Sequence, residues 1–193
     1  MNMRHQISDL YQMQSLSLES KIIMTQHRIR GWYDHYDGDV YVSFSGGKDS
    51  TVLLDIVRNT PGVYDVPAVF ADTGLEFPEI REFVRTFDDV TIVRPKMNFR
   101  QVIQKYGYPV VSKEVSRRVQ YARKAIAEGR EQNHGDYLKL CGLALDKNGN
   151  KSQYNCEKWK FLLDAPFRCS SECCSVMKKN PMKQYEKETG RMP

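Results

Sequence analysis

The stretch SGGKDS at residues 45–50 decides the fold that this sequence predicts. The residues before it, 39–44 (DVYVSF), are β-branched and aromatic, which is typical of a short strand. The residues after it, 51–58 (TVLLDIVR), are apolar and run into Asn-Thr-Pro-Gly at 59–62. That pattern predicts a helix that ends before the proline. A pair of glycines therefore lies where a strand turns into a helix.

A strand–turn–helix junction of this kind is suited to holding an anion. Glycine lets the backbone approach a phosphate closely, and the first amides of the helix have no partners within the helix. The serine hydroxyls add donors, and Lys48 adds a positive charge. The spacing is not that of a Walker A loop, because the glycines are adjacent and an aspartate follows the lysine. The alternative is a serine-capped turn that binds nothing.

Two further strands are expected to end beside this loop. Residues 67–71 (PAVFA) predict a second strand, which ends in Asp72-Thr73-Gly74, and residues 90–95 predict a third, with Arg94 at its end. A strand–helix–strand unit implies parallel strands, whose carboxyl ends meet at one edge of the sheet, where ligands bind. The alternative is that Asp72 or Thr73 only caps the next helix, which Pro78 opens.

The remaining pattern is mainly helical. Residues 7–36 predict two helical pieces that meet around residues 15–17, with Ser17 as a cap, and residues 99–106 predict another helix. A longer helix is expected after Ser112, with the apolar stripe Val115, Val119, Ala122 and Ile126. Regularity falls between residues 131 and 167, which we interpret as a lid or an insertion.

Lysines and arginines cover the other faces of that longer helix, and most of them are interpreted as solvated. Lys113 and Arg117 are the exceptions, because they lie one turn apart on one face near the start of the helix. We expect these two side chains to reach a phosphate or another anion of the substrate.

Composition narrows the class of protein. The 193 residues are 40% hydrophobic and 27% charged, which is ordinary for a soluble globular protein, and the net charge of +5 fits a polyanionic ligand. No apolar run approaches 18 residues and no export leader is evident, so we expect a cytoplasmic protein without a membrane span. The five cysteines are then expected to be thiols or metal ligands.

The motifs together carry a resemblance to a known family. SGGKDS is similar to the pyrophosphate loop (PP-loop) of the N-type ATP pyrophosphatases, and DTGLEFPE at 72–79, Arg94-Pro95 and CCSVMKKNPM at 173–182 follow in order. Over residues 40–193 the chain resembles phosphoadenosine phosphosulfate reductase-like proteins. The resemblance implies an α/β fold, a Rossmann-like parallel sheet with helices on both faces, of the adenine nucleotide alpha-hydrolase type. We expect a helical segment at 1–38, a nucleotide-binding core at 39–130, and a Cys-containing insertion with the C-terminal part of the same domain at 131–193.

The resemblance also implies a ligand and its site. ATP or a related adenine nucleotide, with Mg²⁺, would place its phosphates on the loop and its adenosine near residues 72–74. The candidate nucleotide-binding residues are Ser43, Ser45, Gly46, Gly47, Lys48, Asp49, Ser50, Asp72, Thr73, Gly74, Arg94 and Arg117. The candidate catalytic residues are Lys48, Asp49 and Lys113.

A cluster of cysteines, Cys169, Cys173 and Cys174, is the candidate metal site. Thiolates bind iron–sulfur clusters, and an adjacent cysteine pair occurs in the iron–sulfur members of the family, completed there by later cysteines. No cysteine follows Cys174 in this sequence, and Cys141 or Cys156 would have to substitute. A [4Fe-4S] cluster and thiols without metal remain alternatives.

Three functions remain open from the sequence. The first is an enzyme that cleaves ATP between the α- and β-phosphates and adenylates an acceptor, a nucleic acid or a sulfur carrier, for sulfur or amine transfer. The second is an oxidoreductase, a sulfonucleotide reductase, although the Glu-Cys-Gly-x-His type tail of those enzymes is absent from these residues. The third is a nucleotide-binding module without catalysis. Because residues 188–193 resemble the approach to a further strand of the family, we expect a shortened relative or a fragment; a homodimer is also an alternative.

Overall fold

The computed structural model describes residues 6–193, and the chain divides into two compact units. The first unit contains the chain up to Asp72, together with Glu76–Val93 and Met182–Pro193. The second unit contains Thr73–Leu75 and Arg94–Pro181. Each unit has a hydrophobic core of its own. The three segments drawn from the sequence stay a prediction.

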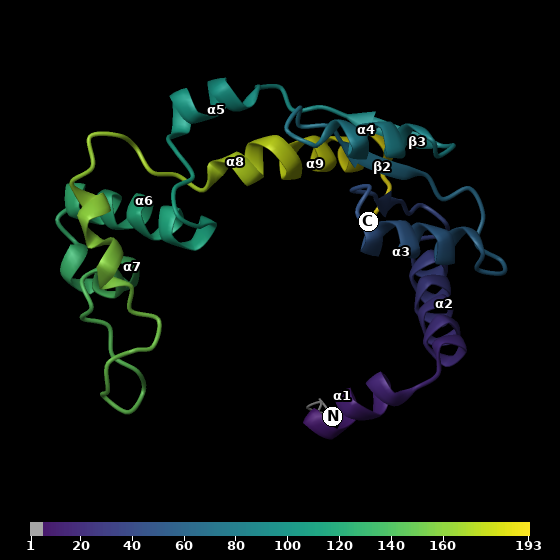
Figure 1. Ribbon diagram of the computed structural model, residues 1–193, viewed down its shortest axis with the longest axis horizontal. Helices are drawn as coiled ribbons and strands as arrows, with labels where there is room; N and C mark the ends of the chain where they lie inside the picture. The colour runs from purple at the N-terminus through teal and green to yellow at the C-terminus, as the bar shows by residue number, and fades with distance from the viewer. Residues whose placement is uncertain (1–5) are drawn as a thin grey trace. The chain divides into compact units, whose positions relative to one another are not determined.

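The first unit is built on a parallel sheet (Figure 1). Its elements are α1 (Ile7–Ser15), α2 (Leu18–His35), β1 (Val42–Ser43), α3 (Lys48–Arg58), β2 (Ala68–Ala71), α4 (Pro78–Arg85), β3 (Val90–Val93) and most of α9 (Asn180–Thr189). The strand order is β1-β2-β3, with Val42 opposite Ala68 and Ala71 opposite Val93. This alternation of parallel strands and helices confirms the predicted α/β class.

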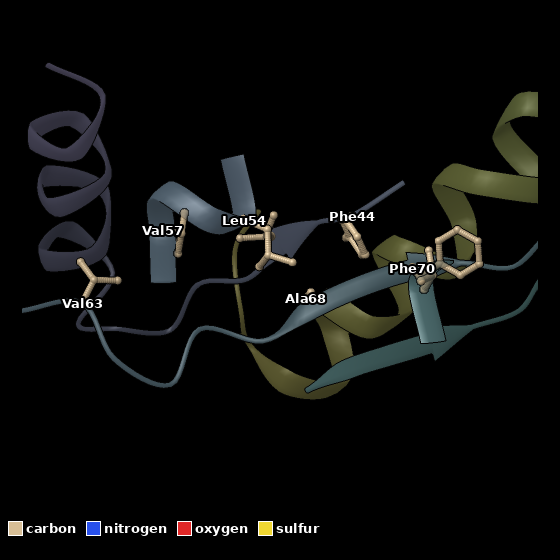
Figure 2. Close-up of a cluster of buried hydrophobic side chains, with 8 residues drawn as sticks. Phe44, Leu54, Val57, Val63, Ala68 and Phe70 are labelled. Atoms are coloured by element: carbon tan, nitrogen blue, oxygen red, sulfur yellow. The ribbon is translucent and has the colours of Figure 1, made fainter. Parts of the chain in front are cut away.

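Helices cover both faces of this sheet. On one face, buried side chains of the strands, of the adjoining loops and of α3 form one cluster. Figure 2 labels six of its members, Phe44, Leu54, Val57, Val63, Ala68 and Phe70. On the other face, the ring of Tyr41 packs edge-on against Tyr185 of α9, with the ring centroids 5.2 Å apart. Side chains alternate along an extended backbone, so Tyr41 and its neighbour Val42 point to opposite faces of the sheet. A helix packs on each of these faces.

The ends of the first-unit elements follow local chemistry. Ser17 caps α2 as predicted, because its hydroxyl accepts a hydrogen bond of 3.2 Å from the Ser20 amide. Strand β1 is shorter than the predicted 39–44, and Val40 instead forms a single parallel bridge with Met192. In the described part of the chain, no helix is both long and apolar enough to cross a membrane.

The second unit is mostly helical. Its elements are α5 (Phe99–Tyr106), α6 (Lys113–Ala127), the 3-10 turn η1 (Glu131–Asn133), α7 (Gly135–Leu140), the 3-10 helix η2 (Glu157–Leu163), α8 (Glu172–Cys174) and the π-helical turn η3 (Ser175–Lys179). Its core contains Val115, Val119, Ala122, Leu140, Leu162 and Cys169. The predicted cap at Ser112 is confirmed, since its hydroxyl accepts from the Val115 amide.

One expectation for the second unit was wrong. The stripe of α6 does not include Ile126, whose side chain is 44% exposed, because the buried face continues through Ala125 instead. The predicted fall in regularity between residues 131 and 167 is confirmed, since α7 and η2 are short and irregular chain lies between them. The interpretation of these residues as a lid or an insertion stays a prediction.

Candidate functional site

The loop between β1 and α3 is shaped by one glycine. Gly46 has φ +72°, which residues other than glycine rarely adopt. A Cβ atom at this position would lie 2.8 Å from Val84 Cγ2 and 3.0 Å from Ile80 Cγ2. Helix α4 therefore packs directly on the loop, and the absence of a side chain at residue 46 is what allows that contact.

The two serines of the loop brace it from within. The Ser50 hydroxyl donates to the Gly47 carbonyl at 2.9 Å and accepts from the Ser45 amide at 3.2 Å. The two hydroxyl oxygens are 3.0 Å apart, and the Ser45 hydroxyl also accepts from the Gly47 amide at 3.3 Å. The sequence predicts these hydroxyls as phosphate donors. In the structure they hold the turn in shape, which preorganises the backbone amides for a ligand.

The start of α3 carries the groups that suit an anion. Gly47 is the N-cap and has no side chain, so no cap covers the amides of Lys48, Asp49 and Ser50. Within residues 6–193, these three amides have no acceptor, as expected for the first turn of a helix. The side chains of Lys48 and Asp49 are exposed. The positive end of the helix dipole and the lysine both favour a negatively charged ligand here.

Asp72 lies at the carboxyl end of β2 and therefore at the same edge of the parallel sheet as the loop that follows β1. Its side chain is buried, and its carboxylate accepts from Arg81 Nη2 of α4 at 3.2 Å. The Asp72 amide donates to the carbonyl of Val93 at the end of β3. Arg81 is not among the residues that the sequence pattern predicts for the site, although its position in the first turn after Pro78 places it near the end of β2.

Thr73 and Gly74 continue the turn after Asp72 and belong to the second unit. Thr73 is buried, and its hydroxyl accepts from the Leu75 amide at 3.2 Å, while Gly74 has φ +77°. Arg94 is exposed and follows β3 directly in the chain. Their convergence with residues 45–50 on one nucleotide stays a prediction.

The two basic residues chosen on α6 differ in their surroundings. Lys113 is the first residue of the helix and is exposed. Arg117 forms a two-point ion pair with Asp136 of α7, with N–O distances of 3.1 and 3.2 Å, and it lies over the ring of Tyr121. The guanidinium of Arg117 therefore ties α6 to α7, and its predicted role in binding phosphate would require that pair to open.

The cysteine cluster does not present a ready metal site. Cys169 is part of the core of the second unit, where burial raises the pKa of its thiol, and the charge of Arg123 offsets only part of that rise. A thiol that holds its proton is a poor metal ligand. Cys173 and Cys174 are half-buried in α8, and among residues 6–193 no three His, Cys, Asp or Glu side chains form a group that could hold a metal.

The region that contains the loop at residues 45–50 is similar to known proteins. Residues 39–134 match the family described as the phosphoadenosine phosphosulfate reductase domain. An uncharacterized protein of Methanocaldococcus jannaschii, MJ0066, is 38% identical over 85 residues, which cover 42% of this chain and 18% of that protein. The phosphoadenosine 5'-phosphosulfate reductase of Aliivibrio salmonicida is 26% identical over 85 residues, 44% of this chain and 33% of the enzyme. The chain thus spans a third or less of these relatives, and no solved structure gives a significant match.

Proposed function

Because residues 39–134 belong to the phosphoadenosine phosphosulfate reductase-like family of the PP-loop superfamily, we propose that the chain is an enzyme that binds an adenine nucleotide at residues 45–50. The observation that carries this proposal is the start of α3, where three amides without acceptors among the described residues lie next to Lys48, in a turn braced by Ser45 and Ser50. Such an arrangement binds the phosphates of a nucleotide and does not by itself select a base or a reaction.

The reaction that we propose is cleavage of ATP between its α- and β-phosphates. An oxygen of the acceptor attacks the α-phosphorus, the bond to the β-phosphate oxygen breaks, and pyrophosphate leaves with the electron pair. The adenylated acceptor is then open to displacement of AMP by a sulfur or amine nucleophile. The amides at the start of α3 would hold the departing pyrophosphate, and Lys48 would offset its growing charge. Asp49 would orient the loop or bind, through water, the Mg²⁺ that accompanies the phosphates.

Chemistry of this kind fits the first unit because it needs positioning and charge more than a protein nucleophile. All five cysteines of the chain lie in the second unit, and none lies in the unit that contains the loop. A second candidate, reduction of a sulfonucleotide, is favoured by the similarity to the Aliivibrio salmonicida reductase. That reaction needs a thiolate, which the raised pKa of Cys169 disfavours at that residue.

The test is binding followed by turnover. Calorimetry with ATP, AMP and pyrophosphate should give micromolar to millimolar affinities. Lys48→Met should lower the affinity for pyrophosphate at least about tenfold, because a charge-assisted hydrogen bond is lost. Lys183→Met, an exposed lysine of α9, is the matched control and should bind as the wild type does. Absence of binding by both ATP and pyrophosphate would contradict the proposal.

Turnover separates the two reactions. Release of pyrophosphate from ATP and Mg²⁺, tested with and without candidate acceptors, supports adenylation. Release of sulfite from adenylyl or phosphoadenylyl sulfate in the presence of thioredoxin would establish the reductase instead. Tight binding without either product would leave the chain a nucleotide-binding module.

A further inference from the structure

The charges of the chain are divided unequally between its two units. The second unit contains 18 lysines and arginines against 8 aspartates and glutamates, a formal charge of +10. The rest of the chain contains 11 and 16, a formal charge of −5. The modest net charge of +5 is therefore the sum of a strongly basic unit and an acidic one. A unit with a formal charge of +10 attracts polyanions. Recognition of a particular polyanion needs further contacts besides charge.

One segment of the second unit, residues 154–168, combines exposed rings with three exposed cations, and it also contains the two carboxylates of Glu157 and Asp164. In residues 154–168, the side chains of Phe161, Tyr154 and Phe167 are 62%, 59% and 38% exposed. Lys158, Lys160 and Arg168 are exposed between and beside them. The ammonium of Lys139 lies 6.0 Å from the centre of the Tyr154 ring. A single exposed ring is ordinary on a protein surface, but here three exposed rings and three exposed cations occur within 15 residues of the chain.

Two arginines of α6 hold this segment in place. The Arg123 guanidinium donates to the carbonyls of four residues, at 2.6 to 3.0 Å; these are Leu162, Leu163, Ala165 and Phe167. Arg118, which is buried, donates to the Tyr154 carbonyl at 2.6 Å. The backbone that presents the rings is therefore fixed at both ends. Rings on a fixed backbone lose little conformational freedom when they contact a ligand.

We propose that the second unit binds single-stranded nucleic acid on the 154–168 segment, with bases stacked on Phe161 and Tyr154. The phosphates would lie near Lys158, Lys160 and Arg168. Alternating rings and positive charges favour this partner, because every base has a face for stacking and every nucleotide a phosphate. An acidic peptide would use the charges but not the rings. The further role of this nucleic acid as the acceptor of the adenylation rests on the proposed function; its binding does not.

The test is fluorescence anisotropy without nucleotide, using labelled 20-mers of single-stranded RNA, single-stranded DNA and duplex DNA at 50 to 200 mM salt. We expect single strands to bind more tightly than the duplex, and the ratio of RNA to DNA affinity identifies the natural source. Phe161→Ala should weaken binding about fivefold or more through lost stacking. Lys158→Gln with Lys160→Gln should reduce the slope of log affinity against log salt by about 0.7 per lysine.

Lys183→Gln with Lys187→Gln, two exposed lysines of α9 in the first unit, is the matched control and should leave the affinity for the strand unchanged. Circular dichroism checks that every variant is folded. No binding at 50 mM salt, an unchanged affinity in Phe161→Ala, or an equal loss in the control pair would each overturn the proposal. Pyrophosphate binding by the same preparation is measured separately, so failure of this proposal and failure of the proposed function are distinguishable.

Discussion

At the scale of single residues, the candidate site depends most on Gly46. The sequence predicts a glycine pair for close approach to a phosphate, but the structure adds a second reason for the first glycine. Its hydrogen atoms face Ile80 and Val84 of α4, so the same residue sets the turn and seats a helix. Neighbouring Gly47, with φ −82°, has an ordinary backbone conformation and serves as the helix N-cap.

Gly46→Ala should therefore damage both stability and binding. The positive φ and the Cβ contacts below 3.1 Å should together lower the free energy of unfolding by about 2 kcal/mol or more, because strain and overpacking both contribute. Pyrophosphate affinity should fall in the same variant, since the turn must shift away from α4. Urea denaturation and calorimetry measure the two effects.

Gly31→Ala is the control for this substitution. Gly31 lies inside α2, where a Cβ would meet nothing within 4 Å, so the change should stabilise the protein by about 0.5 to 1 kcal/mol. If Gly46→Ala unfolds at the same urea concentration as the wild type, the packing of α4 on the loop is not as described.

At the scale of elements, the second unit is organised by the arginines of α6. The sequence pattern favours a solvated basic face for this helix, apart from Lys113 and Arg117. Two of the arginines expected to be solvated instead donate to backbone carbonyls, Arg118 to that of Tyr154 and Arg123 to those of four residues, while Arg117 pairs with Asp136. Backbone carbonyls are invisible in a sequence, which is why such roles could not be predicted.

Arg123→Met should loosen residues 162–168 while leaving α6 helical. Loss of the charged donor leaves four carbonyls without that partner, and we expect the free energy of unfolding to fall by at least about 2 kcal/mol. Amide hydrogen exchange should show faster exchange for residues 162–170 in particular. Lys124→Met, its exposed neighbour, should change stability by less than about 0.5 kcal/mol. Equal effects of the two substitutions would contradict the role given to Arg123.

At the scale of the whole molecule, the first unit joins residues 40–41 to α9 and to the residues that follow it. The Tyr41 hydroxyl donates to Glu186 of α9 at 2.9 Å, and Arg191 donates to the Val40 carbonyl. Burial, and then the hydrogen bond and charge of Glu186, raise the pKa of Tyr41 well above its ordinary value near 10. The bond to Glu186 ties α9 to the backbone that leads into β1, although 145 positions separate the two bonded residues.

The raised pKa of Tyr41 predicts a stability that depends on alkaline pH. The folded state keeps the phenolic proton to a higher pH than the unfolded state does, so this contribution is complete below about pH 10 and is lost as the pH rises further. Denaturant unfolding between pH 8 and 11.5 should show this decline in the wild type and a flatter profile in Tyr41→Phe. Tyr64→Phe, at a ring that is 69% exposed, controls for the loss of one hydroxyl. Parallel profiles for wild type and Tyr41→Phe would show that Tyr41 does not carry the effect.

The sequence by itself determined the α/β class, the loop at residues 45–50, and the bounds of several helices, among them α5 and the start of α6. These features rest on local information: hydrophobic period, glycine and proline positions, and side-chain caps at Ser17 and Ser112. Only the tertiary structure decided which partners those residues take. It placed Arg81 on Asp72, bonded the loop serines to each other and to loop backbone atoms, and set Cys169 in a core, because these interactions join residues that are distant in the chain or involve backbone atoms that every residue shares.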